Sequence, residues 1–144
     1  MRNIVLLCLM SLFLSGCAVA PERCVFGAGD QAQLQLRQMQ TRYFDTDNKK
    51  MMMESSIATL QDFGFVLDRV SFDLGTITAT KFETREGMLQ NMQMTVTIIP
   101  RSGARMVVRA NARLNVKAIE EPQAYQLFFN ALSQSVFLQA HLDE

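Results

Sequence analysis

The stretch NMQMTVTI, residues 91–98, decides the fold of this chain. Apolar and polar side chains alternate along it without a break, which is the pattern of a β-strand with one buried and one solvated face. A shift of one residue in its pairing would move every apolar side chain to the solvent, so we expect a fixed register. The apolar side chains are those of Met92, Met94, Val96 and Ile98, and the polar ones are those of Asn91, Gln93, Thr95 and Thr97.

A second alternating stretch follows the turn sequence PRSG, residues 100–103. Residues 104–114, ARMVVRANARL, also separate into two sets of opposite parity, so we expect another strand with one buried face. The inward set is Met106, Val108, Ala110, Ala112 and Leu114, and the outward set is Arg105, Val107, Arg109, Asn111 and Arg113.

Three stretches upstream also predict strands. Residues 65–72 and 76–82 are rich in β-branched or aromatic side chains, and residues 36–44 alternate imperfectly and end in the β-favouring Tyr43 and Phe44. In the third of these, Ile77 and Ala79 are expected to point inward between outward threonines. Residues 73–75 are expected to form a turn and residues 83–87 a charged loop.

Two segments predict amphipathic helices. The first follows the capping residues 45–47 and runs to Phe63, with Gly64 after its end and a buried face of Met53, Ile57, Leu60 and Phe63, whereas Met51 and Met52 are expected to be half exposed. The second begins at Glu120, Glu121 and Pro122, where carboxylates favour the helix dipole, and runs to about His141. Its core stripe is Tyr125, Phe128, Phe129, Leu132 and Val136, broadened by Leu127, Phe137 and Leu138, so this helix is expected to be largely covered.

These elements predict an α+β fold of one domain over residues 36–144, in the order β-α-β-β-β-β-α. The strands offer a single apolar face, so we expect one curved, mainly antiparallel sheet with both helices packed on that face. The opposite face of the sheet is then left open.

The N-terminus has the zones of a secretory signal. Arg2 precedes an apolar run over residues 4–14, which spans only about 16 Å as a helix at ~1.5 Å per residue. A bilayer core needs about 20 residues, so the run is expected to be a signal segment rather than a stable span. Residues 18–34 show no helical or strand period, and we expect residues 17–35 to form a flexible tether.

The residues Leu14, Ser15, Gly16 and Cys17 resemble the bacterial lipobox. The resemblance implies cleavage of a signal peptide over residues 1–16 and attachment of diacylglycerol to the sulfur of Cys17, which then anchors the protein to a membrane. Ala18 and Val19 follow the cysteine, where an Asp retains enteric lipoproteins at the inner membrane. By this resemblance the chain is expected at the outer membrane, facing the periplasm.

A second resemblance lies in the domain, in ATLQDFGF at 58–65, VLDRV at 66–70 and GTITA at 75–79. This pattern resembles the helix-grip, TATA-box-binding-protein-like domains of the C lipoprotein of the outer-membrane β-barrel assembly machine. The whole chain is also similar to small proteobacterial lipoproteins of unknown function. The resemblance implies an accessory or assembly role in the envelope, and it carries no catalytic motif to this chain.

Composition and motifs argue against several function classes. The 14 basic and 14 acidic residues balance, which argues against nucleic-acid binding, and one His with three Cys argues against a zinc site or a disulfide scaffold. Nucleotide, redox and zinc-protease motifs are absent from the sequence, so we expect no enzyme, cofactor or metal. The run Met51–Met53 is spread about 100° per residue around a helix and does not converge on one ion.

The candidate site is the open face of the sheet. Arg105, Arg109 and Arg113 recur every four residues, which places them on one side of a strand about 13 Å apart at ~3.3 Å per residue. Beside them we expect Gln93, Thr95 and Thr97, and beyond those Thr76, Thr78 and Thr80. This surface is either an ordinary solvated face or a docking surface for an acidic protein, a peptide or an anionic glycan.

Three functions follow as hypotheses. The first is a non-enzymatic envelope lipoprotein that binds a protein partner through this face. The second is a carrier of a small molecule or lipid in a cleft between helices and sheet, suggested by the Met- and Phe-rich interior. The third is self-association through an edge strand or through Cys24, which has no catalytic partner nearby in the sequence. The oligomeric state is left open by the sequence.

Overall fold

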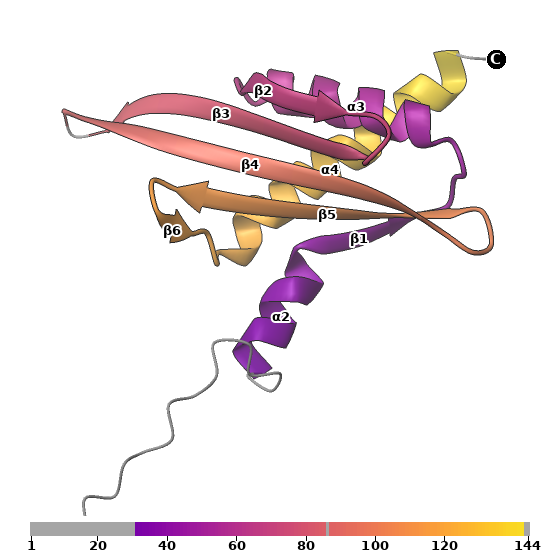
Figure 1. The fold of residues 1–144 in the computed structure, drawn as a ribbon, viewed down its shortest axis with the longest axis horizontal. Coiled ribbons are helices and arrows are strands. Elements are labelled where there is room, and N and C mark those ends of the chain that lie inside the picture. Colours follow the sequence, from indigo (N-terminus) through magenta and orange to yellow (C-terminus); the bar gives the residue numbers. More distant parts are fainter. Residues whose placement is uncertain (1–30, 86, 143–144) are drawn as a thin grey trace, which may run out of the picture.

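A computed structural model describes residues 31–85 and 87–142 of the chain (Figure 1). The expected signal peptide, Cys17, Cys24 and the first part of the expected tether lie outside the described residues. The elements are α2 (Gln31–Met39), β1 (Thr41–Phe44), α3 (Lys49–Asp62), β2 (Val66–Ser71), β3 (Thr76–Arg85), β4 (Met88–Arg101), β5 (Arg105–Leu114), β6 (Lys117–Ala118) and α4 (Pro122–Leu142).

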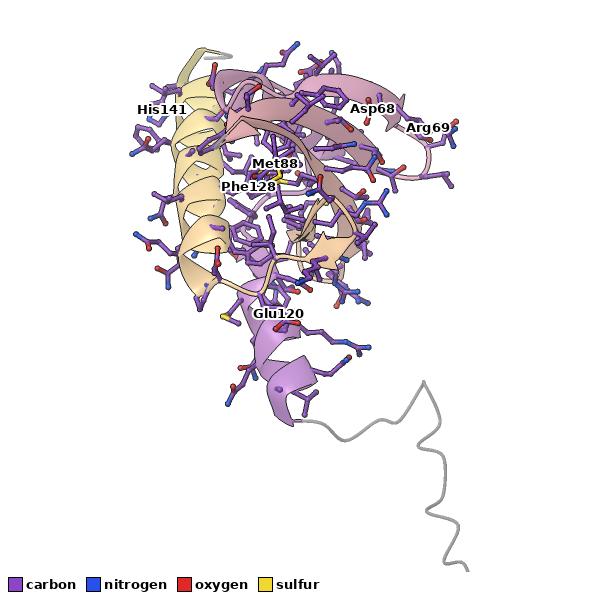
Figure 2. The ribbon with its side chains drawn as sticks, turned by 90° about the vertical axis from the view of Figure 1, so that its left-hand side faces the viewer. Asp68, Arg69, Met88, Glu120, Phe128 and His141 are labelled. Atoms are coloured by element: carbon purple, nitrogen blue, oxygen red, sulfur yellow. The ribbon has the colours of Figure 1, made fainter. Side chains whose placement is uncertain are left out.

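The strands form one antiparallel sheet in the order β1-β5-β4-β3-β2, and the short β6 pairs with the end of β5. Helices α3 and α4 pack against one face of this sheet and against each other (Figures 1 and 2). The predicted α+β fold with two helices on one sheet face is therefore confirmed, and α2 is an additional helix beside β1 and α4.

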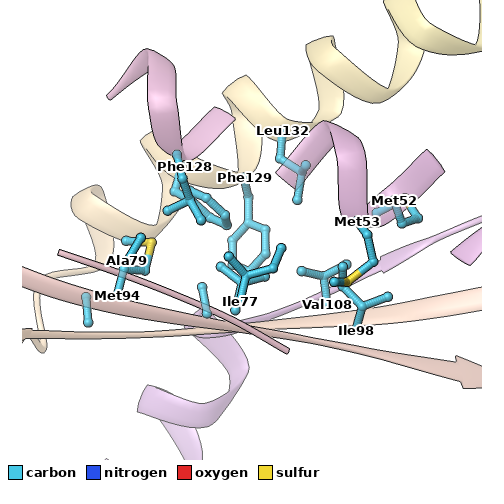
Figure 3. Packing of buried hydrophobic residues seen from close by; sticks show 14 of the residues in the cluster. Met52, Met53, Ile77, Ala79, Met94, Ile98, Val108, Phe128, Phe129 and Leu132 are labelled. Atoms are coloured by element: carbon cyan, nitrogen blue, oxygen red, sulfur yellow. The ribbon is translucent and has the colours of Figure 1, made fainter. Parts of the chain in front are cut away.

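The core lies between this sheet face and the two helices (Figure 3). The β4–β5 ladder pairs Met92 with Leu114 and continues without a shift to Arg101 and Arg105, so the two apolar sets share one face as predicted. The strands and the α4 stripe supply most of the buried side chains: Ile77, Ala79, Met94, Val96, Ile98, Met106, Val108, Ala110, Ala112, Tyr125, Phe128, Phe129 and Leu132.

The prediction of a strand over residues 36–44 is wrong in its first part. Residues 36–39 belong to the helix α2, and only Thr41–Phe44 form a strand. The helical segment QAQLQLRQM has no β-branched residue, and its Gln, Leu, Ala, Arg and Met favour helices. Leu36 packs against the core, so residues 31–35, which the sequence assigned to a tether, lie in a helix next to the domain.

The predicted helix over residues 45–63 begins later than its capping sequence suggested. Asn48 is the N-cap, and its side-chain oxygen accepts a hydrogen bond from the Met51 backbone N–H at 2.9 Å. The helix ends before Gly64, whose φ of +79° fits the predicted position after the C-terminus.

Met51 and Met52 are buried, which corrects the prediction that they are half exposed, and Phe63 is 37% exposed although it was predicted to be buried. The reason is that α3 touches both the sheet and α4, so its buried arc is wider than one stripe. Ser55 faces α4, where its hydroxyl donates to the Gln139 side-chain oxygen at 3.4 Å, and other small hydroxyl residues bond the preceding turn of α3. Ser56 donates to the Met52 carbonyl at 2.7 Å, and Thr59 donates to the Ser55 carbonyl at 2.7 Å.

The β3–β4 hairpin is longer than predicted. Residues 83–85, expected in a loop, continue β3 and pair with β4 up to Arg85 and Met88. At the other end, β4 runs through Pro100, which was predicted in a turn and instead pairs with Met106 of β5. A proline is tolerated here because β3 begins opposite Thr97, so no strand pairs with Pro100 on that side.

Helix α4 ends close to its predicted end but begins at Pro122, after Glu120 and Glu121, and its predicted coverage is wrong. Leu127 is 56% exposed, and Phe137 and Leu138 are each 62% exposed. Helix α4 buries the sides that face the sheet and α3, and no described element covers its outer side.

The hydroxyl of Tyr125 joins three segments in the buried interior. It donates to the Ile119 carbonyl at 2.7 Å, and it accepts from the Ala112 backbone N–H at 3.3 Å and from the Gln40 side-chain amide at 3.1 Å. Tyr125 is fully buried and Gln40 nearly so. The start of α4, the strand β5 and the α2–β1 junction are therefore linked through one oxygen atom.

We expect Tyr125→Phe to lower the free energy of unfolding by about 1–3 kcal/mol, because the substitution leaves buried donors on Ala112 and Gln40 unpaired. Urea denaturation followed by circular dichroism measures this change. Tyr43→Phe is the matched control, since the Tyr43 side chain is 64% exposed, and it should leave stability within about 0.5 kcal/mol of the parent. Equal effects of the two substitutions would contradict the role of the Tyr125 hydroxyl.

Candidate functional site

The sheet face opposite α3 and α4, called the open face here, carries the predicted site. In Figure 2, α4 lies on one side of the sheet, and Asp68 and Arg69 lie on the side turned away from it. The described helices pack on the other side, so the open face is uncovered within the described part of the chain.

The strand register brings all the predicted site residues together. Arg109 lies opposite Thr97, and Arg113 lies opposite Gln93. On the next strand, Thr95 lies opposite Thr78. Arg105 shares the parity of the other two arginines of β5 and ends the row at the β4–β5 turn. The open face therefore contains Arg105, Arg109, Arg113, Gln93, Thr95, Thr97 and Thr78, as predicted.

Two further arginines belong to this face and were not predicted. Arg101 lies directly opposite Arg105, which became visible only because β4 continues past Pro100. Arg69 lies opposite Thr78, but the shift in register between Leu67 and Arg69 hides its parity in the sequence. A bulge interrupts the alternation of inward and outward side chains, so the outward residues of such a strand cannot be identified from the sequence pattern.

Val107 lies on the open face, as its parity predicted, yet it is buried. Its neighbours across the sheet are Tyr43 on β1 and Ile99 on β4, and both are larger than the threonines elsewhere on the face. The open face is thus apolar at this position, between Arg105 and Arg109.

The centre of the open face is a hydrogen-bonded network. The Thr80 hydroxyl donates to an Asp68 carboxylate oxygen at 2.6 Å, and the Gln93 amide reaches the same hydroxyl at 3.5 Å. The hydroxyl oxygens of Thr78 and Thr95 are also 3.5 Å apart. These polar side chains already have hydrogen-bond partners within the open face.

The arginines of the open face differ from these hydrogen-bonded side chains, because they have no carboxylate partner among the described residues. The ion pairs of the described chain join Lys50 to Glu54 and Lys81 to Glu83, away from the arginine row. Asp68 is the acidic residue of the open face, and Thr80 already bonds it. The face is strongly cationic on a chain with no net charge, through Arg69, Arg101, Arg105, Arg109 and Arg113.

Other positions considered from the sequence have structural roles. Met51, Met52 and Met53 are buried side chains of the packed helix α3. His141 is exposed at the end of α4, where its ring lies 4.2 Å from that of Phe137. Within the described residues, no group of three His, Cys, Asp or Glu side chains is arranged to hold a metal ion.

The space between helices and sheet, where a carrier cleft was expected under the second hypothesis, is filled by the core side chains (Figure 3). A hollow of about 380 Å³ lies instead on the outer side of α4, lined by Ser133, Gln134, Phe137 and Leu138. This hollow is formed by the helix alone.

Among the described helices, none is both long enough and apolar enough to cross a bilayer. Comparison of the chain with protein-family models finds no match, and comparison with curated proteins finds no significant match. The geometry of the open face and the sequence of the N-terminus are therefore the features that bear on function.

We expect Arg101→Glu to raise the free energy of unfolding by about 0.2–1 kcal/mol at low salt, because it replaces a like-charge pair opposite Arg105 by an opposite-charge pair. The gain should shrink at high salt, where exposed charges are screened. Arg113→Glu is the control, since its neighbours Gln93 and Ala118 carry no charge. Urea denaturation at two salt concentrations measures both variants, and an equal or larger gain for Arg113→Glu would contradict the assigned register.

Proposed function

We propose that this chain is a non-enzymatic lipoprotein of the bacterial cell envelope, an accessory or assembly subunit that binds an acidic segment of a protein partner through the open face. The observation that carries the proposal is a row of arginines that, among the described residues, have no carboxylate partner and lie on a sheet face that no described element covers. A concentration of positive charge on one surface attracts and orients ligands of opposite charge.

A carboxylate-bearing protein segment fits this face better than the other anions considered. Each guanidinium offers a planar fork that binds a carboxylate through two parallel hydrogen bonds. Arg105, Arg109 and Arg113 are spaced about 13 Å apart, four residues at ~3.3 Å each, along one straight strand. An extended or helical protein segment presents separated carboxylates over such a length. The balanced charge of the whole chain argues against a nucleic acid.

The proposed location rests on the lipobox-like sequence at residues 14–17. A diacylglycerol on Cys17, with a further acyl chain, anchors a protein stably, because one chain alone binds a membrane only marginally. The domain is thereby held near the outer membrane with its open face accessible to a periplasmic partner. The resemblance to the helix-grip domains of an assembly lipoprotein supports the same kind of role.

Photocrosslinking in intact native cells tests the proposal. A photoreactive amino acid at position 95 or 109, on the open face, should give a discrete adduct with a protein. The same residue at position 134, on the outer side of α4, is the control and should not give that adduct. Arg109→Glu should reduce the adduct formed from position 95 at least several-fold, whereas Arg37→Glu on α2 should not.

The absence of any discrete adduct from both positions 95 and 109 would overturn the proposal. An adduct that forms equally from position 134 would show that the open face is not the binding surface. Loss of the adduct on Arg37→Glu as strong as that on Arg109→Glu would indicate a general charge effect instead of a contact.

A further inference from the structure

The open face also carries a row of exposed apolar side chains, at the end away from Arg105. Val66 is 70% exposed, Phe82 is 62% exposed and Leu89 is 70% exposed. Phe82 has the parity of Thr78 and Thr80, opposite to that of the buried Ile77 and Ala79, so it lies on the open face. Leu89 has the parity of Gln93 and Thr95 on β4 and lies on the same face.

These three residues are neighbours across three strands. Val66 pairs with Thr80, two residues from Phe82, so Val66 and Phe82 are diagonal neighbours on β2 and β3. Leu89 pairs with Thr84, also two residues from Phe82, which makes Phe82 and Leu89 diagonal neighbours on β3 and β4. Diagonal pairs in a sheet are about 7–8 Å apart, within reach of aromatic and long side chains. Val66, Phe82 and Leu89 therefore form one row, called the apolar row here.

The apolar row continues directly from the cationic part of the open face. Gln93 pairs with both Arg113 and Thr80, and it is a diagonal neighbour of Phe82. Phe82 is thus two strands and two residues from Arg113, or about 12 Å at ~4.8 Å per strand and ~3.3 Å per residue. In Figure 1 the β3–β4 hairpin that carries Phe82 and Leu89 extends past the ends of α3 and α4. No described helix covers this part of the sheet.

Tyr43 of β1 is also exposed on the open face, but it is a single side chain opposite Val107. Phe137 and Leu138 are as exposed as Phe82, but they lie on α4, on the far side of the sheet from the arginines. The apolar row therefore combines exposed apolar side chains from three neighbouring strands with arginines that have no carboxylate partner among the described residues. Interfaces bind through such a combination, with a buried apolar or aromatic anchor surrounded by polar and charged contacts.

From this arrangement we propose that the partner segment carries, beside its acidic residues, a bulky apolar side chain that docks on Val66, Phe82 and Leu89. The acidic residues pair with the arginines of β5, and the apolar side chain fixes the direction of the segment across the sheet. This inference rests on the proposed function, because it names the chemistry of the partner for the same face. We infer a protein segment as the ligand because the apolar row is continuous with the arginines, so one ligand with acidic and apolar side chains contacts both.

Crosslinking from the two parts of the face in intact native cells, with the full chain, tests the inference. A photoreactive residue at position 82 and one at position 109 should label the same protein. Mass spectrometry should find the label from position 109 in an acidic stretch, and the label from position 82 at or beside a bulky apolar residue within the same segment. In a second arm, Phe82→Ser should reduce the adduct from position 109 about 5-fold or more. Phe137→Ser, at an equally exposed phenylalanine, should leave it unchanged.

The outcomes separate the inference from the proposed function. If position 109 labels a partner and position 82 labels none, or Phe82→Ser has no effect, the apolar row is not part of the site and the inference fails while the proposed function stands. Labelling of lipid from position 82 would assign the row to a membrane surface and overturn the inference in the same way. If position 109 labels nothing, the proposed function fails and the inference fails with it.

Discussion

The unbroken register between β4 and β5 is the constraint on which the rest of the structure depends. Ten successive pairs, from Met92 with Leu114 to Arg101 with Arg105, keep the same parity on both strands. That parity sends Met94, Val96 and Val108 into the core and leaves the arginines outside. A slip by one residue would bury guanidinium groups beneath the helices, and burying unpaired charges costs far more than the pairing gains. The core and the candidate site are therefore fixed by the same set of hydrogen bonds.

This arrangement separates stability from binding. The helices α3 and α4 cover one face, and the Tyr125 hydroxyl links α4, β5 and the α2–β1 junction beneath them. Residues of the open face take almost no part in that packing. The face is consequently free to carry a concentration of positive charge, although the like-charge pair of Arg101 opposite Arg105 opposes folding. The exposed row of Val66, Phe82 and Leu89 likewise lies outside that packing.

The strict alternation of apolar and polar residues predicted the two central strands and their inward residues. It also predicted which site residues share the open face. The errors occur where local pattern and tertiary packing differ. Residues 36–39 end next to a β-favouring segment, yet their own helix propensity and the burial of Leu36 make them helical. Met51 and Met52 are buried because α3 has two neighbours, which no single stripe reveals. Arg69 was missed because a bulge interrupts β2, and Arg101 because Pro100 was read as the end of a strand although its β3 side is unpaired.

The most direct test of the central claim measures how accessible the arginines are with and without the cellular partner. An arginine-selective dicarbonyl reagent, followed by peptide mass spectrometry, is applied to the purified chain and to intact cell envelopes. Arg105, Arg109 and Arg113 should react readily in the purified chain and be protected in the envelopes, whereas the exposed Arg37 of α2 should react in both. Equal reactivity of the three β5 arginines in the two preparations would show that nothing binds the open face, and it would contradict the account.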